Sequence, residues 1–211
     1  MGKSQVTPNL EFSYVASDER IAKTAEALTA NGMQTFVVAT AEEARKKVVE
    51  LIPKGAEVFT ATSRTLDKIG AVAEIETSGR YDVVRNRLVD LDREGQERAK
   101  RQLGAAPDVL VASVHAITEQ GQLLIASMSG SQLWPGVSGA AKVIYVVGVQ
   151  KLVAHLDEGL RRIHEYTLPL EDERVMNSYG INSAVNKLLI INREIVPERI
   201  SLILVKENLG F

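Results

Sequence analysis

The sequence predicts an α/β fold, a Rossmann-like three-layer αβα sandwich built on a mostly parallel sheet. Residues 34–39 and 56–61 are short β-branched or apolar runs, and each is followed by a helical pattern. Strands and helices that alternate at this spacing favour right-handed βαβ units, with helices on both faces of a parallel sheet. Residues 143–149, which contain IYVVG, are apolar on both faces and are therefore expected in the middle of that sheet.

Capping signals mark the starts of the first two helices. Ser17 is followed by Asp18 and Glu19, which suits an N-cap and the positive end of a helix dipole. Thr40 and Glu43 have the spacing of a capping box. Both helices are expected to lie between strands of the sheet.

The second half of the chain contains two further helical patterns and two strand-like runs. Residues 84–103 carry leucines at helical spacing among acids and bases, which predicts one charged, solvent-facing helix. Residues 151–166 predict the clearest amphipathic helix. The runs 188–192 and 199–206 are separated by a few residues that include Pro197, too few for a crossover helix. They are therefore predicted to form a C-terminal antiparallel strand pair.

Composition limits the classes of function. The 211 residues are 45% hydrophobic and 25% charged, with a formal net charge of −2 and a pI of about 6.0, so neither nucleic acid nor a membrane surface is an expected partner. The absence of cysteine excludes disulfides, thiolate metal sites and a cysteine nucleophile. The polar start of the chain predicts a cytoplasmic protein, with a tail over residues 1–16 and a single domain over residues 17–211.

A long neutral stretch runs from Glu119 to Lys142. No ionisable side chain lies between these two ends, and glycines, serines and Pro135 interrupt the stretch. Only residues 123–126 keep a strand-like apolar pattern. A buried strand that leads into a loop rich in hydroxyls and backbone N–H groups is typical of the wall of a small-ligand pocket.

A second candidate binding segment, Thr62-Ser63-Arg64-Thr65, follows the strand at 56–61 and precedes a helical pattern. Free N–H groups at such a turn hold phosphate or carboxylate groups. Plain helix capping by the hydroxyls is the alternative, and the sequence leaves both open.

The three histidines do not predict a metal site. His155 and His164 are nine residues apart, about two and a half helical turns, and so point in opposite directions. His115 has no partner nearby in the sequence. Neither a metal nor a cofactor is therefore expected.

Nearly the whole chain, from Ser17 to Phe211, resembles the LUD-domain proteins, a family named for lactate utilisation. The resemblance rests on the order and spacing of five segments: TSRTLDKIG, SVHAITEQGQLL leading into SGS, KVIYVVGVQKLV with LDEGLRRI, LPLEDERVMNSYG with NSAVNKLLII, and ISLILVKENLGF. It implies a fold similar to the sugar-phosphate isomerase and coenzyme A transferase group, with the ligand at the carboxyl edge of the parallel strands. Many relatives carry a cysteine cluster where this chain reads YGINSAVNK, so a redox role taken from them does not transfer.

The first functional hypothesis is a protein or enzyme that binds a small anionic metabolite with a carboxylate, phosphate or coenzyme A-type group. Glu119 is then the candidate general acid–base, with a pKa raised by apolar surroundings. The alternative is that Glu119 caps a turn in solvent. The expected ligand-binding residues come from the two loops, with an amide and two neighbours as further candidates: Thr62, Ser63, Arg64, Thr65, Gly121, Ser129, Gly130, Ser131 and Asn182, then Ser183 and Asn186.

The second hypothesis is a non-catalytic accessory subunit of L-lactate oxidation. The resemblance suggests iron–sulfur or oxidoreductase subunits as partners, and a homo-oligomer is also open. Trp134, the only tryptophan, is a candidate interface anchor, pocket wall or core residue.

Overall fold

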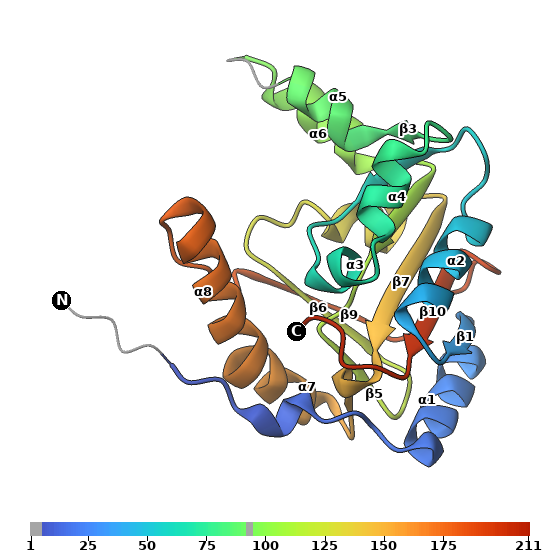
Figure 1. Cartoon of the computed structure of the whole chain (residues 1–211), viewed down its shortest axis with the longest axis vertical. Helices are drawn as coiled ribbons and strands as arrows, with labels where there is room; N and C mark the ends of the chain where they lie inside the picture. Colours follow the sequence, from blue (N-terminus) through green and yellow to red (C-terminus); the bar gives the residue numbers. More distant parts are fainter. Residues whose placement is uncertain (1–5, 92–94) are drawn as a thin grey trace.

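The computed structural model describes residues 6–91 and 95–211. An N-terminal 3₁₀ turn, Leu10–Ser13, precedes the main elements (Figure 1). In chain order these are α1 (Asp18–Ala30), β1 (Gln34–Val38), α2 (Ala41–Leu51), β2 (Glu57–Thr60), α3 (Arg64–Lys68), α4 (Ala71–Thr77), β3 (Asp82–Val83), α5 (Val84–Asp90), α6 (Glu97–Ala105), β4 (Val109–Ala112), β5 (Ala116–Thr118), β6 (Leu123–Ser127), β7 (Lys142–Gly148), β8 (Leu152–Val153), α7 (Leu156–Arg162), α8 (Leu168–Tyr179), β9 (Lys187–Ile191) and β10 (Ile200–Val205).

A six-stranded parallel sheet, as seen in the described residues, forms the centre of the molecule. Its strand order is β1-β10-β7-β4-β2-β3, and every neighbouring pair is parallel. The predicted α/β fold is therefore confirmed. β7 lies between β10 and β4 and is buried along almost its whole length, so its predicted place in the middle of the sheet is confirmed as well.

The two faces of this sheet are covered differently. Side chains of α2, α3 and α4 pack on one face, where they contact alternate residues of β2, β4, β7 and β10. The other face packs against α1, α5 and a second sheet, of order β8-β5-β6-β9 in the described chain. The outer side of this smaller sheet is covered by α7 and the turn after it.

The predicted pairing of the last two strands is wrong. β9 pairs antiparallel with β6 in the smaller sheet, whereas β10 lies parallel between β1 and β7 in the large one. Their burial explains the difference, because every residue of β10 is buried while β9 is largely exposed. The short connection between them passes from one sheet to the other, so it does not have to form a hairpin or a crossover.

The predicted charged helix over residues 84–103 is two helices, α5 and α6. The first ends at Asp90, and Gly95 before the second has a φ of 87°, which no α-helix tolerates. Asp92, Arg93 and Glu94, which the pattern assigned to that helix, lie outside the described residues.

The helix predicted from Lys151 starts five residues later. Leu152 and Val153 instead form β8, which pairs parallel with β5. The helix begins at Leu156, where Nδ1 of His155 accepts the backbone N–H of Glu158 as an N-cap. It then continues through a π turn, Ile163–Thr167, into α8. In the described parts of the chain no helix is long and apolar enough to cross a bilayer.

Replacing Gly121 with Ala is expected to destabilise the protein more than the same change at Gly55. Both glycines have a left-handed φ, 77° and 80°, so each variant loses about 1–2 kcal/mol of unfolding free energy. A Cβ at Gly121 would also lie 2.8 Å from the carbonyl carbon of Ala27 and 2.9 Å from the nitrogen of Leu28. Such overpacking adds roughly 1–3 kcal/mol.

The Gly55→Ala variant measures the cost of the left-handed backbone alone, since no described atom lies within 4 Å of the added Cβ. Urea unfolding curves of the two variants measure the difference. Equal midpoints would contradict the close packing of this turn against α1.

Candidate functional site

A cavity of about 430 Å³ lies at the carboxyl ends of three neighbouring strands, β2, β4 and β7. Residues 61–64 follow β2, residues 113–115 follow β4, and Lys151 follows β7 after a single 3₁₀ turn. The loop after β6 and one side of α8 complete the wall. Because the strands are parallel, chain segments far apart in sequence meet at this edge.

Lys151 lies at the inner end of the cavity and is 1% exposed. Its Nζ is 3.0 Å from Oγ1 of Thr65, 3.1 Å from Oγ of Ser113 and 3.1 Å from the carbonyl oxygen of Val114. Burial holds the pKa of Lys151 well below its usual value, and the nearby charges of Arg162 and Lys68 lower it further. Within the described chain, no carboxylate forms an ion pair with this lysine, so nothing offsets that effect.

Arg162 is a second buried cation behind the cavity wall. Its Nη1 donates to the carbonyl oxygen of His115 and, over 3.1 Å, to Oγ1 of Thr167, and both partners line the cavity. Its Nε and Nη2 have no hydrogen-bond partner, and among the residues the structure describes it has no carboxylate partner. Burial lowers the pKa of Arg162 to about 10, so the guanidinium remains charged at neutral pH.

The imidazole of His115 adds no charge to the site. Its Nδ1 accepts the backbone N–H of Ala126 over 3.0 Å. Burial, with the charges of Lys151 and Arg162, lowers the pKa of His115 to about 3. The ring is therefore neutral at physiological pH.

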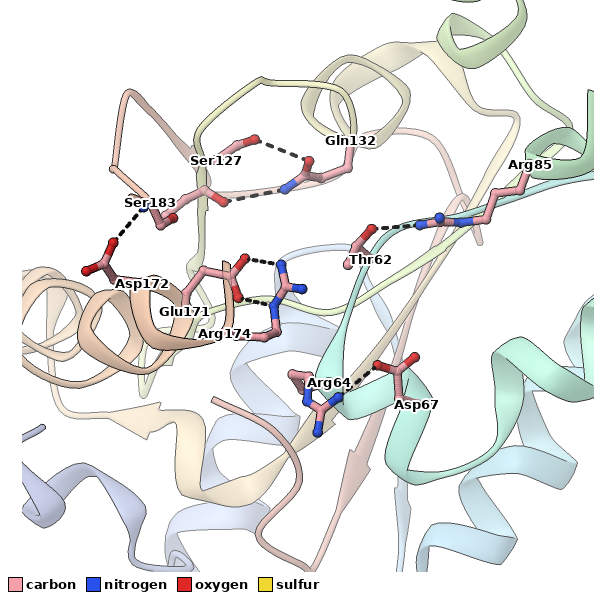
Figure 2. Close-up of polar contacts among 11 residues, drawn as sticks. Thr62, Arg64, Asp67, Arg85, Ser127, Gln132, Glu171, Asp172, Arg174 and Ser183 are labelled. Atoms are coloured by element: carbon pink, nitrogen blue, oxygen red, sulfur yellow. Dashed lines mark hydrogen bonds and ion pairs between the residues drawn. The ribbon is translucent and has the colours of Figure 1, made fainter. Parts of the chain in front are cut away.

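The outer part of the cavity carries one paired and one weakly paired arginine, as Figure 2 shows. Arg174 on α8 binds both carboxylate oxygens of Glu171 over 2.7 Å each, which raises the pKa of the arginine and neutralises the acid. Arg64 is about half exposed and lies 3.7 Å from Asp67, beyond hydrogen-bond length. The lining therefore has an excess of positive charge, with Arg64 free to turn toward a ligand.

Six of the eleven predicted binding residues line the cavity. They come from the segment after β2 and the loop after β6, joined by one further candidate: Thr62, Ser63, Arg64, Ser129, Ser131 and Ser183. Ser63 also caps α3 by accepting the N–H of Leu66 over 3.4 Å. The capping and binding interpretations of this turn are thus compatible.

The other predicted residues lie elsewhere. Thr65 is buried behind Lys151, and the N–H of Gly130 donates to Ser127 within the loop. Gly121 packs on α1. Asn182 lines a neighbouring cavity beside the N-terminal segment, and Asn186 donates to the carbonyl oxygen of Met128 over 3.2 Å.

The prediction that Glu119 has a raised pKa is wrong. Its carboxylate lies 2.8 Å from Nε of Arg20 and 2.7 Å from Nζ of Lys23, both on α1. The hydrogen bond from Lys23 and the charges of both partners hold the pKa of Glu119 below its usual value. Glu119 is not among the residues that line the cavity; it ties the turn between β5 and β6 to α1.

The sequence interpretation missed the innermost residues of the site. Ser113 ends the run VLVAS and was a visible hydroxyl at a strand end, the same signal that identified Thr62. Lys151 and Arg162 both fell within the helix predicted over residues 151–166, and neither was a candidate for the site. Across the described chain no group of three or more His, Cys, Asp or Glu side chains comes together as a metal site.

The fold and the cavity define an α/β protein with a ligand-sized site at the carboxyl edge of a parallel sheet. A family model described as the LUD domain matches residues 21–205, and the chain belongs to that family. This confirms the resemblance seen in the sequence and makes the chain a protein of the lactate-utilisation type. None of the curated proteins matches it.

Two solved structures give the structural comparison. A DUF162 family protein from Deinococcus radiodurans has a TM-score of 0.58 at 14% identity, over 91% of this chain and 99% of that one. At this identity the likeness shows the fold alone. Ribose 5-phosphate isomerase from Plasmodium falciparum has a TM-score of 0.33 at 13% identity, over 54% of this chain and 52% of that one.

Replacing Glu119 with Gln is expected to lower stability at neutral pH by about 1 kcal/mol or less, because the lost ion pairs are partly exposed. The native pKa is depressed, so the stabilisation is present above the unfolded pKa and is lost as the pH falls through the native one. Denaturant unfolding at several pH values should show wild type and variant converging in acid. A gap that persisted below the native pKa would contradict the ion-pair assignment.

Proposed function

We propose that the protein binds a small anionic metabolite, with a carboxylate or phosphate group, in the cavity at the carboxyl edge of the large sheet. The observation that carries the proposal is the charge of Arg162, which is buried behind the cavity wall with no carboxylate partner in the described chain. The Tyr166 ring, 5.1 Å from the guanidinium carbon, and the hydrogen bonds of Nη1 offset only part of the cost of burying this charge, and an anion in the cavity would offset more of it.

The remaining lining suits such a ligand. A volume of about 430 Å³ is within the range of small-molecule pockets. Hydroxyl groups of Thr62, Ser129 and Ser131 supply neutral donors, and Arg64 supplies a mobile charge at the mouth. The acid nearest to this mouth on α8, Glu171, is already neutralised by Arg174 and does not repel an anion.

Membership of the LUD-domain family makes L-lactate and pyruvate the first ligands to test, followed by sugar phosphates and coenzyme A thioesters. Thermal unfolding with each compound is the direct experiment. A ligand at about a hundred times its dissociation constant adds roughly 2.7 kcal/mol to the unfolding free energy. No shift with any anionic compound would contradict the proposal.

Replacing Arg64 with Gln is expected to weaken binding of the anion about tenfold or more. A hydrogen bond to a charged group contributes roughly 1.5–3 kcal/mol, and each 1.4 kcal/mol is about a factor of ten in affinity. Isothermal titration of both proteins measures the change.

The matched control is Arg80→Gln. Arg80 is comparably exposed and pairs with Glu74, but its backbone bonds to Gly55 at the opposite end of β2. Affinity that fell equally in both variants would show a general charge effect, and the assignment of Arg64 would be wrong.

A second candidate function, the non-catalytic accessory subunit, is favoured by one observation. Trp134 is 58% exposed, with Val137 close by in the same loop 45% exposed, so this tryptophan is not a core residue. Exposed aromatic side chains of this kind anchor protein interfaces.

Trp134 is the only tryptophan, so its fluorescence reports directly on this surface. If an iron–sulfur or oxidoreductase subunit covers it, emission should shift to shorter wavelength during titration, and Trp134→Ala should weaken the complex. Unchanged emission in a complex shown to form by sedimentation would place the interface elsewhere.

A further inference from the structure

Three oxygen atoms surround Nζ of Lys151, and two of them can only accept a hydrogen bond from it. The carbonyl oxygen of Val114, 3.1 Å from Nζ, can only accept. The hydroxyl of Thr65 donates its proton to the carbonyl oxygen of Leu209 over 2.9 Å, so it presents a lone pair to the lysine 3.0 Å away. A neutral amine has two N–H groups, and these two acceptors use both of them.

The third neighbour of Nζ is the hydroxyl of Ser113, at 3.1 Å. Its other acceptors, the carbonyl oxygen of Val114 and Oγ1 of Thr65, are farther away at 3.3 Å and 3.4 Å. A charged Lys151 donates to the Ser113 oxygen; in the neutral form, with its two N–H groups engaged by Thr65 and Val114, its lone pair faces the Ser113 hydroxyl and can accept that proton. Ser113 is partly exposed and lines the cavity, so its oxygen is open to a ligand on the other side.

The surroundings of the lysine favour the neutral form that this arrangement requires. The charged groups that act on Nζ are the cations Arg162 and Lys68, which together with burial hold the pKa of Lys151 well below its usual value. The nearest other titratable ring, His115, is itself neutral. A base of this kind next to a hydroxyl, oriented by a third group, is the arrangement that activates a serine nucleophile.

We infer that Ser113 is a nucleophile and Lys151 its general base, and that the site transfers the acyl group of an ester or thioester of a short anionic acid. The inference rests on the proposed function, because the anionic ligand is here the acyl donor. Thr65 acts as a positioning residue, since it orients the amine and does not line the cavity.

The chemical step balances with water as the only other reactant. Oγ of Ser113 attacks the carbonyl carbon while its proton passes to Nζ, and the carbonyl π electrons move to the oxygen. The tetrahedral intermediate then collapses, the bond to the alcohol or thiol leaving group breaks, and that group takes the proton from Lys151. Water activated in the same way releases the acid and restores Ser113. Arg162 does not line the cavity, so its positive charge favours the oxyanion of both intermediates only through space, from behind the wall.

The test uses the full chain, a fluorophosphonate probe and 4-nitrophenyl acetate, with intact-mass measurement and peptide mapping. Wild type should gain one adduct per chain, on Ser113, and Ser113→Ala should gain none. Lys151→Met should react at least about a hundredfold more slowly, as expected for loss of a general base. Ser78→Ala, at a partly exposed position outside the cavity, is the control and should react like wild type.

A second variant covers the case in which Lys151→Met does not fold. Ser113→Cys carries the only thiol of the chain, so its alkylation by iodoacetamide is unambiguous. The neighbouring amine should take the thiol proton and lower the pKa of alkylation below that of a free cysteine. Reaction at the ordinary cysteine pKa would overturn the inference, as would an acyl adduct on any other residue or no adduct on wild type.

The outcome separates this inference from the proposed function. Ser113→Ala should keep the thermal stabilisation by small anions, because Arg64 and the charge of Arg162 are untouched. Anion binding without acylation of Ser113 would overturn the acyl-transfer inference alone. Absence of both would overturn the proposed function as well.

Discussion

The parallel pairing of β2, β4 and β7 is the constraint on which the site depends. These neighbouring strands all end at one edge, so the residues that follow them meet although almost ninety positions separate Thr65 from Lys151. Each segment then turns differently: into a short capped helix after β2, into the smaller sheet after β4, and through a 3₁₀ turn after β7. The cavity is the space between the three segments that follow these strands and α8.

Burial of positive charge is the second feature of the site, and it follows from that geometry. Lys151 sits where the sheet edge is already covered, and Arg162 enters from α7 on the far side of the smaller sheet. The carboxylates of this region are engaged elsewhere: Glu171 by Arg174, and Glu119 by Arg20 and Lys23. Lys151 and Arg162 therefore contact neutral oxygens, and Arg162 also the ring of Tyr166. Burial lowers the pKa of both side chains, which favours the neutral form of Lys151, while the guanidinium keeps its charge.

Local patterns in the sequence correctly predicted the features that depend only on neighbouring residues. The caps at Ser17 and Thr40, the buried run of β7 and the hydroxyl turn after β2 all depend on residues next to one another, and all are present in the structure. The errors involve partners distant in sequence. Glu119 meets Lys23 across 96 positions, and β9 and β10 separate because each finds a different sheet.

Lys151 illustrates why the inner site escaped sequence reasoning. Its neighbours Leu152 and Val153 fit a helical stripe, yet their pairing with β5 holds them extended and turns the lysine into the sheet edge. No periodicity in the chain encodes that contact, because the strand that competes with the helix lies more than thirty positions away. The role of Ser113 could not be predicted either, because it depends on the contact with Lys151, which follows a different strand, β7.

A buried lysine and a buried arginine, neither with a carboxylate partner in the described residues, are a poor solution for stability alone. Apolar side chains of similar volume at positions 151 and 162 would fill the same space without the desolvation penalty of a charged group. Nε and Nη2 of Arg162 are also buried without a hydrogen-bond partner, whereas most buried polar atoms in proteins have one. Local violations of the rules for a stable core are expected at functional sites. That these violations border the same cavity, on the edge where parallel sheets hold their ligands, is the physical reason to seek the chemistry of this protein there.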